Sequence, residues 1–198
     1  MVKKLRGGGI RACSKRIDTC LSILTDVIRE VESYSCEQQQ DKEHDSLWDD
    51  LLSEDGIRDA SHDAKLPLSD DDKLILDKGL VLLKGVRLLL RKIARVMLRK
   101  DTSLSPNSNN PECIGLMDDI AEGTSQISAL ADDLANALDI PMNMREVASA
   151  ASNLVLKASE MVESAKGFSV ERDVEWFTTC RKQLDDTLES VLERRVTR

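Results

Sequence analysis

The stretch that decides the fold runs from Ser69 to Arg99 and reads SDDDKLILDKGLVLLKGVRLLLRKIARVMLR. Apolar residues recur in it every three or four positions, which is the spacing of one buried face of an α-helix. This face consists of Leu76, Leu80, Leu83, Val86, Leu90, Ile93 and Met97. Ser69, with Asp72 three residues later, resembles a capping box, and acidic residues in the first turn suit the positive end of the helix dipole. The pattern predicts a long helix with Ser69 as its N-cap.

The same rhythm continues toward the C-terminus in three further stretches. They span about residues 112–138, 141–166 and 170–196, and short connections separate them. Helices joined by short connections pack as antiparallel neighbours. The sequence therefore predicts an all-α protein in which residues 69–198 form an antiparallel four-helix bundle.

A further helical pattern precedes this bundle, over residues 10–34. Its apolar stripe is formed by Ile17, Cys20, Leu21, Leu24, Val27, Ile28 and Val31. Residues 1–40 thus comprise a basic N-terminus and one helix, and residues 41–68 separate that helix from the bundle as an acidic flexible linker without a sustained period. We expect the helix either to pack on the bundle as a fifth member or to bury its stripe in an oligomer.

Composition supports the helical prediction and limits the partners. Of the 198 residues, 41% are apolar but only 3% aromatic, which argues against sandwiches and barrels built on aromatic strands. The net charge is −8, so no global basic field attracts nucleic acid or anionic membranes. Between Asp41 and Asp72 there are twelve acidic and three basic residues, a local net charge of −9. The helical body is therefore nearly neutral.

No set of residues specifies an enzyme. Both histidines, His44 and His62, lie in the acidic linker, and the cysteines form no C-x-x-C pair. The chain contains neither a P-loop nor a G-x-G-x-x-G motif. We therefore expect no catalytic residues, no metal, no cofactor and no small-molecule substrate.

The linker contains one short amphipathic segment, which is a candidate for partner binding. Its small apolar face would consist of Leu47, Trp48, Leu51 and Leu52, with Asp49 and Asp50 outside. Such acidic–hydrophobic segments can fold on contact with a partner. The alternative is a linker helix that lies on its own bundle.

Basic residues in the 69–99 stretch form a second candidate. They keep a three- or four-residue spacing and so are expected on one helix face: Lys84, Arg87, Arg91, Arg95 and Arg99. This basic stripe could bind an acidic partner or nucleic acid, or receive the acidic linker. The alternative is a solvated face that pairs with acids on neighbouring helices. The acidic total and the lack of interleaved aromatic residues disfavour nucleic acid.

Targeting signals are not recognisable. The most apolar stretch, residues 79–90, is interrupted by Lys84 and Arg87 and is far shorter than a membrane span requires. Three glycines at 7–9 stand where a signal peptide needs an apolar run. Free, scattered cysteines fit a reducing compartment. We expect a soluble protein of the cytoplasm and nucleus.

Several short motifs resemble one known family. They are LSDDD at 68–72, LMDDI at 116–120, Ile127, DDLA at 132–135 and IPM at 140–142. In order and spacing they resemble the C-terminal half of the cyclin-D-binding (cyclin-D-interacting, GCIP) proteins, also described as maternal Id-like molecules. The resemblance covers about residues 66–196, with an acidic linker before it as in the family.

The resemblance implies a non-catalytic all-α protein of two helical bundles, similar in style to vinculin and catenin. It implies binding to D-type cyclins and helix-loop-helix transcription factors, and negative regulation of cell-cycle progression and transcription. Only one helix stands here in place of the family's N-terminal bundle, which suggests a truncated member. No family motif assigns partner contacts to particular residues. We expect the apolar faces of the helices to be covered within the chain, which would leave no free dimerisation face.

Two other functions remain open from the residues alone. One is a vinculin-like scaffold bundle, which rests on fold analogy. The other is a nucleic-acid-binding helical module that uses the basic stripe. Ser105, before Pro106 in a predicted loop, is in addition a candidate for proline-directed phosphorylation.

Overall fold

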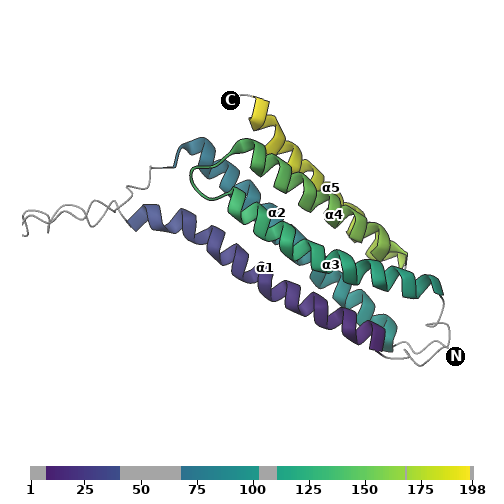
Figure 1. Ribbon diagram of the computed structural model, residues 1–198. Helices are drawn as coiled ribbons and strands as arrows, with labels where there is room; N and C mark the ends of the chain where they lie inside the picture. Colours follow the sequence, from purple (N-terminus) through teal and green to yellow (C-terminus); the bar gives the residue numbers. More distant parts are fainter. Residues whose placement is uncertain (1–7, 41–67, 103–110, 168, 197–198) are drawn as a thin grey trace, which may run out of the picture.

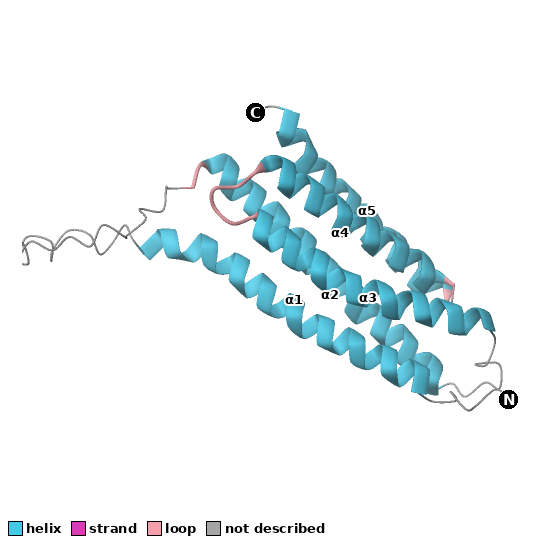
Figure 2. Ribbon diagram, in the orientation of Figure 1, coloured by secondary structure: helices cyan, strands magenta, loops and turns pink. Residues whose placement is uncertain are grey.

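The computed structural model describes residues 8–40, 68–102, 111–167 and 169–196. Within these ranges it contains helices and short turns and no strand, which confirms the predicted all-α class (Figure 2). The helices are α1 (Gly8–Gln40), α2 (Asp70–Thr102), α3 (Pro111–Ala137), α4 (Met144–Lys166) and α5 (Glu171–Val196).

The helices pack side by side as an elongated bundle, and consecutive helices run in opposite directions (Figure 1). Each helix packs against two principal neighbours, in the order α1, α2, α5, α4, α3 and back to α1. A closed ring of five alternating helices must contain one parallel pair, and here it is α1 with α3. The bundle is therefore the five-helix form of the predicted architecture.

Helix α1 fills the space between α2 and α3, which contact each other much less than each contacts α1. Its predicted stripe is in the core, with Ile17 and Leu24 fully buried and Leu21 partly buried. Of the two expected outcomes for this helix, the structure shows packing on the bundle. The helix is also longer than the predicted range of 10–34, since it extends from Gly8 to Gln40.

The caps explain where two of the helices begin. The Ser69 hydroxyl accepts a hydrogen bond from the backbone N–H of Asp72 at 3.1 Å and donates one to the Asp72 carboxylate at 2.6 Å. Helix α4 begins at Met144, so the predicted start at Pro141 is wrong. The reason is Asn143, whose side-chain oxygen accepts from the backbone N–H of Arg145 at 3.0 Å and so caps the helix three residues later.

One continuous core runs through all five helices. On α2 every residue of the predicted apolar face is buried. A second set of large apolar residues is exposed and lies outside this core: Val81, Leu88 and Leu98 on α2, Leu156 on α4 and Val170 before α5. The predicted apolar face of α2 is thus covered within the chain, as expected, whereas Val81 and Leu88 lie outside that face and border the groove described next.

Candidate functional site

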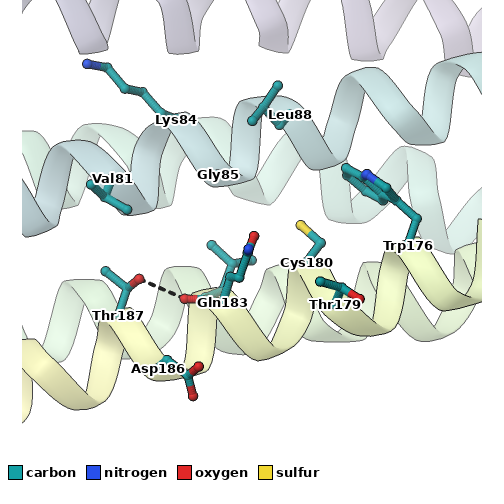
Figure 3. A pocket seen from close by; sticks show the side chains of 11 residues that line it. Val81, Lys84, Gly85, Leu88, Trp176, Thr179, Cys180, Gln183, Asp186 and Thr187 are labelled. Atoms are coloured by element: carbon teal, nitrogen blue, oxygen red, sulfur yellow. Dashed lines mark hydrogen bonds between the residues drawn. The ribbon is translucent and has the colours of Figure 1, made fainter.

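A groove of about 660 Å³ lies on the surface between α2 and α5 (Figure 3). Helix α2 contributes Val81, Gly85 and Leu88, and α5 contributes Trp176, Cys180 and Thr187, among others. Val81 and Leu88 are seven residues apart, which is two helical turns, so they lie on the same face of α2. They are 51% and 54% exposed, respectively. The groove thus has a half-exposed apolar edge.

Gly85 gives the groove its depth. A Cβ atom at this position would stand 2.8 Å from Cδ2 of Leu184, which is too close for van der Waals contact. Because Gly85 has no side chain, Leu184 can pack directly against the backbone of α2. Leu184 is buried and forms the floor of the groove, while Val81 and Leu88 stand on either side of Gly85 along α2.

A buried carboxylate closes the α2–α5 interface beyond the Trp176 end of the groove. Asp173 lies in the first turn of α5, and its side chain is only 4% exposed. It accepts hydrogen bonds from Lys92 Nζ at 2.7 Å and from Arg99 Nη2 at 2.9 Å, both on α2. Lys92 Nζ also lies 5.4 Å from the ring centroid of Trp176, within the range of a cation–π interaction.

This arrangement determines the charge state of Asp173. The hydrogen bond from Lys92 lowers the pKa of the Asp173 carboxyl below its usual value, and the bond from Arg99 lowers it further against the opposing effect of burial. Asp173 is therefore ionised at neutral pH. The Asp173 clamp, by which we mean Asp173, Lys92 and Arg99, joins the C-terminal half of α2 to the beginning of α5.

The predicted basic stripe is divided among four environments. Lys84 forms an ion pair with Glu32 of α1 at 2.7 Å, whereas Arg99 belongs to the Asp173 clamp on α5. Arg91 and Arg95 are exposed. Arg87 is half-buried, and its Nε has no hydrogen-bond partner among the described residues.

The prediction of one basic face needs correction for a geometric reason. Successive spacings of three and four residues from Lys84 to Arg99 spread the side chains over about 120° of the helix circumference. Side chains at one edge of this arc therefore face α1, and those at the other edge face α5. Only Arg91 and Arg95 remain as an exposed basic pair on the outer surface of α2.

The thiol that lines the groove, that of Cys180, is not activated. Burial raises the pKa of the Cys180 thiol to about 11, so this thiol is protonated at neutral pH and is not a nucleophile. No cluster of metal-ligating side chains occurs among the described residues. The apolar edge of Val81 and Leu88 suits the groove to hold apolar side chains.

Other predicted features lie outside the described residues. These are the amphipathic segment of Leu47, Trp48, Leu51 and Leu52, and Ser105; all remain predictions. Conversely, sequence reasoning missed Asp173, Trp176, Val81 and Leu88. The sequence does show that Val81 and Leu88 are apolar residues two turns apart that do not belong to the buried face of the helix. No neighbouring residue indicates that Asp173 contacts Lys92 and Arg99.

Comparisons with known proteins add no assignment. No protein-family model matches the chain, and no curated protein matches it with significant similarity. Within the described ranges, none of the helices combines the length and apolar character that crossing a membrane requires.

Proposed function

We propose that this chain is a non-catalytic protein-interaction module that binds an amphipathic helix of a partner protein in the groove between α2 and α5. The observation that carries the proposal is the pair of half-exposed apolar residues, Val81 and Leu88, beside a groove of about 660 Å³. An amphipathic helix that binds in a groove between two helices buries its own residues at i, i+3 or i+4, and i+7. The seven-residue spacing of Val81 and Leu88 on α2 equals the i to i+7 spacing of such a helix.

The sequence resemblance supplies the identity of the partners within this proposal. We expect a D-type cyclin or a helix-loop-helix transcription factor, proteins whose own interactions are made by helices. Occupying such a helix would withhold it from its other partners. The consequence would be negative regulation of cell-cycle progression and transcription, in the cytoplasm and nucleus.

Binding of purified partners to the full chain tests the proposal. A D-type cyclin and a helix-loop-helix factor are each titrated against the wild type and against the Val81→Lys/Leu88→Lys double variant. We expect binding to at least one partner by the wild type and a loss of at least about tenfold in the variant, since the apolar edge of an interface carries much of its energy.

Leu156→Lys is the matched control. Leu156 is 62% exposed on α4 and does not line the groove, so this variant places a lysine at an exposed leucine outside the groove. It should bind as the wild type does. Binding that is equal in the groove variant and the wild type would refute the groove as the site. Binding of neither partner by the folded wild type would refute the partner assignment.

A further inference from the structure

The exposed surface of α2 changes from apolar to basic after Leu88. Arg91 and Arg95 follow Leu88 by three and seven residues, so they continue the same helix face, and both are exposed. Along α2, the apolar edge formed by Val81 and Leu88 is thus followed by a basic surface of Arg91 and Arg95, which are not among the residues that line the groove.

The neighbouring charges do not cancel this basic surface. On α5, three exposed charged residues precede Trp176, namely Glu171, Arg172 and Glu175, and their net charge is −1. In the Asp173 clamp, two cations share one carboxylate, which leaves one positive charge. The Trp176 end of the groove is therefore positive overall.

The end of the groove near Lys84 and Asp186 has no comparable excess of positive charge. There the charge of Lys84 is neutralised by Glu32 of α1, and Asp186 lines the groove from α5. Positive charge is thus concentrated at one end of an apolar groove. A ligand that fills the groove would need an apolar stripe and, at one end of that stripe, negative charge.

We infer that the occupant is an amphipathic helix of a partner protein that carries acidic residues at the end which meets Arg91 and Arg95. This inference rests on the proposed function and adds the charge of the partner to it. Complementary charges at the edge of an interface select among partners and accelerate association, and their effect weakens with salt. An apolar ligand surface is required as well, because Val81 and Leu88 lie beside the basic pair.

Two synthetic amphipathic peptides serve as probes for this inference. They share one leucine stripe and differ only in the residues that flank it, which are glutamates in one peptide and lysines in the other. Their binding to the full chain is measured by fluorescence anisotropy at low and at high salt. We expect the glutamate peptide to bind about tenfold more tightly at low salt, with a smaller difference at high salt.

Charge-reversal variants test whether Arg91 and Arg95 cause the preference for the glutamate peptide. Arg91→Glu/Arg95→Glu should reverse the preference in favour of the lysine peptide. The matched control is Lys15→Glu/Arg16→Glu, which changes the net charge equally at two exposed cations on α1. This control should keep the preference of the wild type.

The results distinguish this inference from the proposed function. Equal binding of both peptides, lost in Leu88→Lys, would overturn the inference and leave the groove as a helix-binding site. Binding unaffected by Leu88→Lys would overturn both. If the glutamate peptide bound more tightly to a Trp48→Ser/Leu51→Ser chain than to the wild type, the chain's own segment would compete with the peptide for the groove. If duplex DNA displaced the peptide only when Arg91 and Arg95 were present, nucleic acid would be the occupant. Either result would overturn a partner helix as the occupant.

Discussion

The two halves of the α2–α5 interface are closed in different ways. Around Asp173, a buried carboxylate is held by two cations of α2, and the fully buried Phe177 packs edge-to-face against Trp176. Around Gly85, the same two helices leave a groove with Val81 and Leu88 half exposed on its edge. The comparison shows that one pair of helices is closed by buried groups at one end and leaves an exposed apolar groove at the other.

The largest effect is expected at the core of the closed half. Phe177→Ala removes a fully buried aromatic ring that contacts Trp176 edge-to-face, with ring centroids 5.5 Å apart. Deleting a buried phenylalanine costs about 3–5 kcal/mol of unfolding free energy. Urea denaturation followed by circular dichroism measures this loss. A loss below about 1 kcal/mol would mean that the closed half does not hold α5 in place.

The next effect concerns the Asp173 clamp. Asp173→Asn removes the charge that Lys92 and Arg99 share, and we expect a cost of about 2–3 kcal/mol, less than for a fully buried pair because Arg99 is partly exposed. The matched control is Glu32→Gln, whose ion pair with Lys84 is 45% exposed on both sides. That variant should lose less than about 1 kcal/mol. Equal losses in the two variants would remove the distinction between the clamp and an ordinary surface pair.

The pH dependence of stability also tests the contribution of the Asp173 clamp. Since the pKa of Asp173 is lower in the folded state than the value of about 3.9 expected in the unfolded chain, its contribution is complete above that value. The contribution is lost as the pH falls through the folded pKa. Between about pH 5 and pH 2, the wild type should therefore lose more stability than Asp173→Asn. Parallel thermal-melting profiles of the two proteins would contradict this account.

The smallest effect on stability is expected at the groove. Leu88→Lys changes a residue that is already half exposed, so the unfolding free energy should change by no more than about 0.5 kcal/mol. Binding of the glutamate peptide should nevertheless be lost. A loss of more than about 2 kcal/mol would show that Leu88 belongs to the core, and the groove would then not be a free surface.

The sequence predicts the helices well because their signals are local. The apolar face of α2 repeats every three or four residues, and all seven of its members are buried. Helix ends are less certain, because Pro141 could begin a helix as well as Asn143, which has Glu146 three residues later and is the residue that caps α4. The position of α1 between α2 and α3 also depends on tertiary packing.

The candidate site is harder to predict because it depends on contacts between distant segments. The basic residues of α2 look equivalent in sequence, yet Lys84 meets α1, Arg99 meets α5, and Arg91 and Arg95 meet neither. Which environment each one enters is decided by the helices on either side of α2. Similarly, Asp173 looks like one of many acids until it is placed against Lys92.

Amide chemical-shift mapping tests the central claim most directly. Isotope-labelled full chain is titrated with the glutamate peptide, and the perturbed amides are mapped on the bundle. We predict that the shifts concentrate in residues 81–95 of α2 and 176–187 of α5, and that Leu156→Lys gives the same map. Shifts confined to α1 and α3, or an unchanged map in Leu88→Lys, would contradict the groove between α2 and α5 as the binding site.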